Sequence, residues 1–172
     1  MVGDQNVNST TFYNYSDGMY DYADKEFRGF NYVEERIGNK IIQHWFNQDS
    51  SRKGKEYKTL VSDNNSNPYS KNDFLWNSTL TNGHYTVQLG EESAISYDGG
   101  LSNPRIKNIS YSYNRFGNTI EIHSKGDVSD SNDDKYEYFN YLNNSSLWIV
   151  NKLENYSLFD STNTNKIKET FY

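Results

Sequence analysis

The feature that most constrains this chain is a series of short segments in which apolar and polar residues alternate. Strands show this period of two because successive side chains point to opposite faces of a sheet. From Ile37 onward the segments follow one another closely, with Gly, Asn, Asp or Pro clusters between them. The segments expected to form strands are residues 41–46, 57–61, 84–89, 94–97, 106–113, 119–124, 136–142, 147–153, 156–159 and 167–172.

The connections between these segments are short. Residues 115–118 and 143–145 have the composition of hairpin turns, and no helical pattern of about 10–15 residues separates strands after residue 40. Parallel strands need such crossovers, whereas antiparallel strands need only turns. The sequence therefore predicts an all-β antiparallel meander that forms a barrel, lipocalin-like in strand rhythm, or a twisted sandwich. The Gly-x-Trp opening common in lipocalins is absent, so no family membership follows.

The N-terminal part allows two interpretations. Residues 1–10 are polar and are expected to be disordered, which leaves residues 11–172 as a single β-rich domain. Asp17-Gly18 between aromatic runs indicates a tight hairpin. The competing interpretation is a helix, because nearby aromatic residues recur at helical intervals; since Gly29 interrupts a longer helix over residues 19–37, a short one over residues 20–28 is favoured over the longer one.

Composition indicates where burial must come from. The chain has 16 Tyr, 9 Phe and 3 Trp, and its mean hydropathy is −0.99. Aromatic rings are the largest apolar groups available, so an aromatic core is expected.

Charge and cysteine content exclude several functions. With 17 basic and 23 acidic residues the net charge is −6, which disfavours nucleic acids and anionic membrane surfaces as partners. No apolar run is long enough for a transmembrane helix. Without Cys, the chain has no disulfides, thiolate zinc sites or cysteine nucleophiles.

The first residues and the amino-acid composition indicate where in the cell the protein is expected to act and what kind of organism encodes it. The opening has neither the basic nor the apolar part of a signal peptide, but its polar character is typical of a start left after signal removal. Enrichment in Asn, Lys, Ile and Tyr is typical of AT-rich coding. We therefore expect an extracytoplasmic protein of a low-GC bacterium, secreted or lipid-anchored.

Aromatic side chains are the candidate ligand-binding groups, because Tyr and Trp stack on sugar rings or line apolar pockets. Tyr111 and Tyr113 share one strand face, and Tyr136 and Tyr138 share another. The candidate ligand-binding residues are Trp45, Trp76, Tyr111, Tyr113, Tyr136, Tyr138 and Trp148.

Metal and catalytic signals are weak. In the acidic loop 127–134, Asp130, Asn132 and Asp134 offer oxygen ligands for calcium, but their spacing does not fit an EF-hand, and a solvated charged loop is the favoured explanation. His44, His84 and His123 belong to no catalytic motif. No catalytic residue and no cofactor is predicted, and the absence of enzyme activity is favoured.

The leading functional hypothesis is a non-catalytic extracytoplasmic or cell-surface domain that binds a small apolar molecule or a carbohydrate through Tyr and Trp. The first alternative is a structural or protein-interaction component, such as a surface or phage protein, that uses strand edges and aromatic patches. The second alternative is a hydrolase built on scattered carboxylates and histidines.

Overall fold

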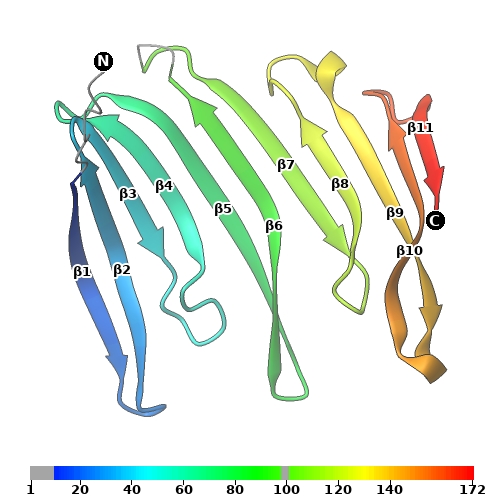
Figure 1. Cartoon of the computed structure of the whole chain (residues 1–172), viewed down its shortest axis with the longest axis horizontal. Helices are drawn as coiled ribbons and strands as arrows, with labels where there is room; N and C mark the ends of the chain where they lie inside the picture. The colour runs from blue at the N-terminus through cyan, green and yellow to red at the C-terminus, as the bar shows by residue number, and fades with distance from the viewer. Residues whose placement is uncertain (1–9, 98–100) are drawn as a thin grey trace, which may run out of the picture.

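The computed structural model describes residues 10–97 and 101–172, and these form one antiparallel β-sheet (Figure 1). Each strand pairs with the next in sequence, so the spatial order is β1 to β11. The strands are β1 (Thr11–Asp21), β2 (Glu26–Ile37), β3 (Lys40–Phe46), β4 (Glu56–Asp63), β5 (Pro68–Thr81), β6 (His84–Ser96), β7 (Arg105–Tyr113), β8 (Thr119–Lys125), β9 (Lys135–Asn144), β10 (Ile149–Phe159) and β11 (Lys166–Phe171). Residues 1–9, which make up most of the segment predicted to be disordered, lie outside the described residues.

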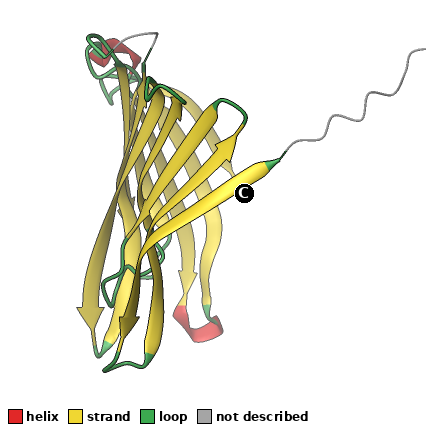
Figure 2. Ribbon diagram, turned by 90° about the vertical axis from the view of Figure 1, so that its left-hand side faces the viewer, coloured by secondary structure: helices red, strands yellow, loops and turns green. Residues whose placement is uncertain are grey.

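The sheet is open and has a single layer. Figure 2 shows the twisted strands side by side without a second sheet against them. In the described residues β1 pairs only with β2, and β11 only with β10, so these two strands are the edges. The all-β antiparallel meander is confirmed. The barrel or sandwich is not, because alternation specifies strands and turns but not closure or a second layer.

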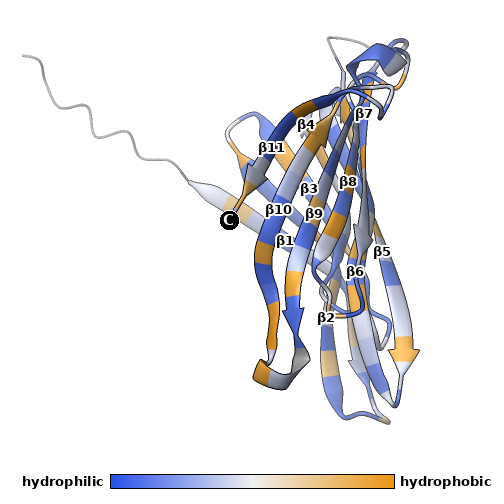
Figure 3. Cartoon of the chain, turned by 90° about the vertical axis from the view of Figure 1, so that its right-hand side faces the viewer, coloured by the Kyte–Doolittle hydropathy of each residue, from blue (hydrophilic) through white to orange (hydrophobic). Residues whose placement is uncertain are grey.

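The expected aromatic core is absent. None of the hydrophobic residues that the structure describes is buried. The buried residues are polar or charged: Arg28, Glu34, Ser62, Asn155 and Ser157. Figure 3 shows apolar and polar positions interspersed along the same strands. A lone sheet has no second layer to cover either face, so its rings stay exposed or half-buried.

The short helix predicted over residues 20–28 is wrong. That segment contains the end of β1, a turn at residues 22–25 and the start of β2, with Tyr20 paired to Phe27. The Asp17-Gly18 pair is not the turn either. It lies within β1, where Asp17 has a φ of 56° and the register shifts between Gly18 and Tyr20. Pairing between β1 and β2 therefore determines the structure of this segment, although its aromatic residues also recur at helical intervals.

Two short 3-10 turns complete the structure. These are η1 (Ser131–Asp133) before β9 and η2 (Ser145–Leu147) before β10. Two pairs of predicted segments merge, 84–89 with 94–97 in β6, and most of 147–153 with 156–159 in β10. In the part of the chain that the structure describes, no helix has the length and apolar character needed to cross a bilayer.

Candidate interaction surface

A buried arginine joins the first hairpin to the loop that follows β3. The Arg28 guanidinium forms ion pairs with Asp21 at 2.5 Å and Asp24 at 2.8 Å, both at the end of the β1–β2 hairpin. It also donates hydrogen bonds to the Gln48 carbonyl oxygen at 3.2 Å and to Ser50 Oγ at 3.1 Å. The side chain is only 5% exposed. Arg28 therefore fixes the position of the hairpin turn relative to the β3–β4 loop.

Two further side chains of the same loop contact the hairpin. Gln48 Nε2 donates to the carbonyl oxygens of Asp17 at 2.7 Å and Gly29 at 2.9 Å. Lys53 forms an ion pair with Glu26. We call Arg28, Gln48 and Lys53, with these partners, the hairpin clasp. It holds β1, β2 and the β3–β4 loop in one defined arrangement.

The loop itself is ordered by Asp49. Burial opposes ionisation of this carboxyl, but the Ser51 hydroxyl, the backbone N–H groups of Ser51 and Arg52 and the Arg52 side chain donate hydrogen bonds to it, which lower the pKa of Asp49 to about 2. The carboxylate therefore stays charged at neutral pH and organises the loop that carries Gln48 and Lys53.

The hairpin held by the clasp presents a group of exposed aromatic rings. Tyr15 lies 5.2 Å from Phe30 between ring centroids, Phe30 lies 5.4 Å from Phe27, and Tyr13 stacks on Tyr15 at 6.4 Å. We call the exposed rings of β1, β2 and their turn the aromatic hairpin; they are Phe12, Tyr13, Tyr15, Tyr20, Tyr22, Phe27 and Phe30. The ring contacts join Tyr13, Tyr15, Phe30 and Phe27 into one cluster, whereas Phe12 projects from the opposite face of β1. Clustered exposed rings of this kind mark sites of protein contact.

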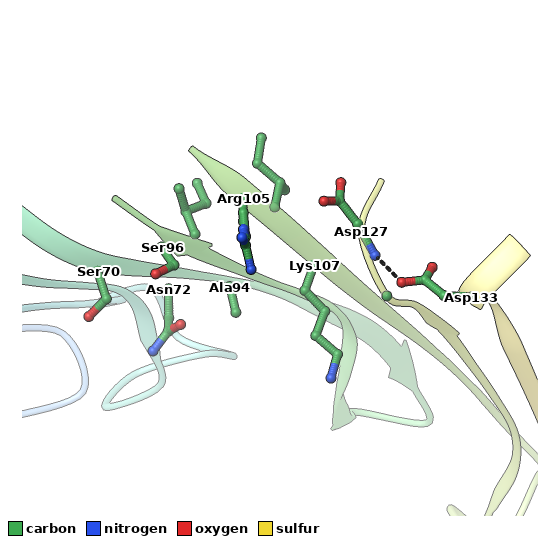
Figure 4. A pocket seen from close by; sticks show the side chains of 11 residues that line it. Ser70, Asn72, Ala94, Ser96, Arg105, Lys107, Asp127 and Asp133 are labelled. Carbon is green, nitrogen blue, oxygen red and sulfur yellow. Dashed lines mark hydrogen bonds between the residues drawn. The ribbon is translucent and has the colours of Figure 1, made fainter. Parts of the chain in front are cut away.

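An open groove lies on the middle of the sheet, and both aliphatic and charged side chains line it. It has a volume of about 520 Å³ and is lined by β5, β6, β7 and the loop before η1. Figure 4 shows Arg105 and Lys107 beside Asp127 and Asp133, whose carboxylate accepts a 2.9 Å hydrogen bond from the Asp127 N–H. Mixed charge on an open surface differs from the enclosed, largely apolar pocket that a small apolar ligand requires.

The predicted ligand-binding residues are not brought together. His123 pairs with both Ser110 and Tyr136, so Tyr136 projects from the face opposite to Tyr111, the neighbour of Ser110. The seven residues are spread over β3, β5, β7, β9 and the η2–β10 connection. Ligand binding by any single one of them stays a prediction.

Six of these seven side chains have local partners. The Tyr111 hydroxyl donates to Glu92 Oε1 at 3.1 Å, and burial together with the Glu92 charge raises the pKa of Tyr111 to about 12. The Tyr113 hydroxyl donates to the Leu89 carbonyl oxygen at 2.8 Å. Trp76 Nε1 donates to the Glu56 carbonyl oxygen at 2.7 Å. Tyr138 packs edge-on against Phe159 with ring centroids 5.6 Å apart.

Two of the remaining three side chains pack against other rings, and the third is exposed. Trp45 packs against Tyr32 at 5.3 Å, and Tyr136 stacks on His123 at 4.1 Å. Trp148 follows η2 and is 85% exposed. The residues with partners therefore contribute to the cohesion of the sheet.

The candidate calcium ligands have partners of their own. Asp130 Oδ1 accepts hydrogen bonds from the Asn132 backbone N–H at 3.0 Å and from Asn132 Nδ2 at 2.8 Å. Asp134 instead lies 3.1 Å from His123 Nε2. Over residues 10–97 and 101–172, no group of three or more His, Asp or Glu side chains is placed to hold a metal ion. A calcium role for the loop stays a prediction.

The histidines do not converge. His44 on β3 lies between two carboxylates, with Nδ1 2.6 Å from Glu56 and Nε2 3.9 Å from Glu35. His84 is exposed at the start of β6, and His123 lies on β8. Each histidine thus belongs to a separate local contact.

Sequence reasoning missed both parts of the interaction surface. The Phe12–Tyr15 run was a usable signal for the aromatic hairpin. The clasp had no such signal, because Arg28 reaches Gln48 and Ser50 across more than one strand of intervening chain.

Comparisons with known proteins point to components of toxin complexes. The family model described as the insecticide toxin TcdB middle/N-terminal region matches residues 3–59, which include β1, β2, β3 and the hairpin clasp. None of the curated proteins compared with the chain matches it.

Solved toxin complexes share the fold. The crystal structure of TcdB2-TccC3 without its hypervariable C-terminal region has a TM-score of 0.69 and 13% identity, over 91% of this chain and 12% of that one. A mutant Tc holotoxin pore from Photorhabdus luminescens has a TM-score of 0.68 and 14% identity, over 88% of this chain and 12% of that one. The chain thus spans about an eighth of the length of the proteins it resembles, and at these identities the likeness establishes the fold.

These findings overturn the leading functional hypothesis. The prediction of a domain that binds a small apolar molecule or glycan is wrong, since both the family match and the solved structures are components of toxin complexes. They favour the first alternative, a structural or protein-interaction component with protein partners. Carbohydrate or small-molecule binding has no support.

Proposed function

We propose that the chain is a non-catalytic structural segment of a Tc-type toxin complex, and that it contacts neighbouring protein through its faces and edges. The observation that carries this proposal is an 11-stranded open sheet without a single buried hydrophobic residue among those described. A sheet normally buries at least one face, and an obligate interface resembles a domain core cut in half. Neighbouring protein is the cover that such a sheet lacks.

The aromatic hairpin is the proposed principal contact. Phe12 and Tyr22 are 65% and 85% exposed, and rigid aromatic side chains provide the strongest anchors in protein interfaces. The clasp holds the turn that carries Tyr22 before contact, which reduces the entropy lost on binding. The family match to residues 3–59 covers this same unit.

The proposal includes three coarser points. Residues 11–172 act as one β-rich domain, and its sheet is covered by other protein in place of closing as a barrel. An extracellular location agrees with the likeness to toxin complexes. A lipid anchor and a low-GC bacterial host have no support from the comparisons.

A chimera tests the toxin-complex assignment. This chain would replace the segment of TcdB2 that it resembles, and the chimera would be co-expressed with TccC3, the partner named in the solved complex. We expect the two proteins to co-purify. The matched control carries Arg28→Ala, which loosens the clasp and should reduce recovery of the complex. A chimera that resists proteolysis but leaves TccC3 unbound would contradict the proposal.

A second measurement remains decisive if the chimera does not fold. The purified chain should unfold cooperatively and yet bind the apolar dye ANS, because its rings are exposed while folded. Replacing Phe12, Tyr22 and Phe27 by Ser should lower dye binding and preserve the circular dichroism spectrum. A saturable rise in melting temperature with a lipid or an oligosaccharide would instead restore the ligand-binding hypothesis.

A further inference from the structure

The two edges of the sheet differ in how they are protected. Edge strands expose unpaired backbone groups, and natural proteins block them with short length, Lys, Pro or bulges. The β11 edge has six residues and carries Lys166 and Lys168. The β1 edge has 11 residues and contains no Lys, Arg or Pro. Figure 1 places the two edges at opposite ends of the sheet.

Within β1, only the second half is irregular. The register shift between Gly18 and Tyr20, with Asp17 at a φ of 56°, bends the strand there. The first half pairs regularly with β2, from Thr11 opposite Ile37 to Ser16 opposite Tyr32. A regular six-residue edge over residues 11–16 is therefore available for pairing.

This six-residue edge is complementary to itself. If two copies pair antiparallel about a two-fold axis through Asn14, Tyr13 of each lies opposite Tyr15 of the other. Residues two apart share a face, and Tyr13 and Tyr15 are 55% and 51% exposed and already stacked. The pairing therefore joins four tyrosine rings on one face, the kind of cross-strand aromatic pair that stabilises sheets.

Charge is compatible with the same register. The paired residues 12–16 include no carboxylate, and Asp17 lies in the irregular half of β1, so no carboxylate faces a carboxylate. Phe12 lies opposite Ser16, and Asn14 opposite Asn14. Pairing of β1 with the β11 edge of another copy would instead run head to tail into open chains, and the β11 lysines oppose it.

We propose that β1 is a self-association site: residues 12–16 pair antiparallel with the same residues of a second copy, so that the two sheets continue through one two-fold interface. This proposal stands on edge geometry and residue chemistry and does not depend on the likeness to toxin complexes. Two-fold dimers with a self-complementary patch are the commonest form of homo-oligomer.

Light scattering after size-exclusion chromatography gives the first test. We expect the wild-type chain to show twice the 20.1 kDa mass of one chain. Replacing both Tyr13 and Tyr15 by Lys sets like charges across the interface and should weaken the dimer by roughly tenfold or more. Replacing both Tyr69 and Tyr85 by Lys is the matched control, because these rings are 52% and 50% exposed but lie on interior strands β5 and β6. Circular dichroism checks that both variants are folded.

A cross-link tests the register. The chain has no Cys, so Asn14→Cys introduces a single thiol at the proposed two-fold axis, where facing strands approach closely enough for a disulfide. Mild oxidation should convert this variant to a covalent dimer. Thr170→Cys on β11 is the control and should stay uncross-linked.

Three outcomes would overturn the proposal. The first is the mass of a single chain at every concentration, which would leave the edge to a different partner. The second is a ladder of larger masses, which would indicate head-to-tail pairing. The third is a dimer in which Asn14→Cys cross-links no faster than Thr170→Cys, which would place the interface elsewhere.

Discussion

The two ends of the sheet are held by different chemistry. At the N-terminal end, buried Arg28 makes charged contacts between a hairpin and a loop about 20 residues further along the chain. At the C-terminal end, Ser157 Oγ donates to Asn155 Oδ1 at 3.1 Å, and Asn155 Nδ2 donates to Glu169 at 3.2 Å. The first of these contacts lies within β10, and the second joins β10 to the neighbouring strand β11.

This difference shows how a single-layer sheet gains a defined shape. Strand pairing and the hydrogen bonds of Asn155 connect residues of the same or adjacent strands. Such contacts can form in sheets of many different curvatures, as long as the strand register is kept. The clasp instead connects a loop to a hairpin that are not adjacent in sequence, so it specifies one arrangement. The family match to residues 3–59 falls on the end with the clasp. The sheet is therefore most specifically shaped at the end that carries the aromatic hairpin.

The largest expected effect comes from removing the buried arginine. Arg28→Ala should lower the free energy of unfolding by about 2–3 kcal/mol, because several charge-assisted hydrogen bonds disappear and the loop loses its attachment. Urea denaturation measures the change. Arg52→Ala is the matched control, since its ion pair with Asp49 is 38% exposed on the Arg side, and it should cost less than about 1 kcal/mol. If the two variants lost equal amounts of unfolding free energy, the clasp would not hold the N-terminal end more firmly than an exposed ion pair does.

A smaller effect is expected at the C-terminal end. Ser157→Ala should cost about 1 kcal/mol, because it removes one hydroxyl from a buried polar ladder and leaves the strand pairing intact. Ser129→Ala changes an exposed hydroxyl and is the control. If Ser157→Ala destabilised the chain as much as Arg28→Ala, the two ends would be held equally firmly and the comparison would fail.

The sequence revealed the strands more readily than their surroundings. Alternation located β3, β7, β8 and β9 to within two residues, because it follows directly from the geometry of a strand. It did not reveal that both faces would be open, since the same pattern suits a barrel, a sandwich or a lone sheet. The helix predicted over residues 20–28 failed because its ring spacing fits the pairing of Tyr20 with Phe27 equally well.

The candidate site was harder to predict than the fold. Trp45, Tyr111 and Tyr136 were singled out for their chemistry, but the pleat places Tyr111 and Tyr136 on opposite faces. The clasp depends on contacts between distant segments, and the spacing of residues along the chain does not encode such contacts. The aromatic residues of β1 were evident in the sequence, but they were expected to be buried in an aromatic core and so were not considered as a surface.

The smallest expected effect is a pH dependence confined to the N-terminal end. Asp49 has a folded pKa of about 2 against an ordinary value of 3.8, because hydrogen bonds from Ser51 and Arg52 outweigh the cost of its burial. A depressed pKa contributes stability that is present above the unfolded value and lost as the pH falls through the folded one. Wild type should therefore exceed Asp49→Asn in unfolding free energy at pH 6, by less than about 1 kcal/mol because solvent screens a side chain that is 39% exposed.

The difference between these two proteins should shrink as the pH falls from about 4 toward 2, as urea titrations at a series of pH values would measure. In Asn155→Ala, which alters only the C-terminal ladder, the low-pH loss due to Asp49 should persist unchanged. A difference between wild type and Asp49→Asn that stayed constant down to pH 2 would mean that the carboxylate charge does not organise the β3–β4 loop. The loop would then depend on Arg28 and Gln48 alone, and the clasp would act without the ordered support assigned to it.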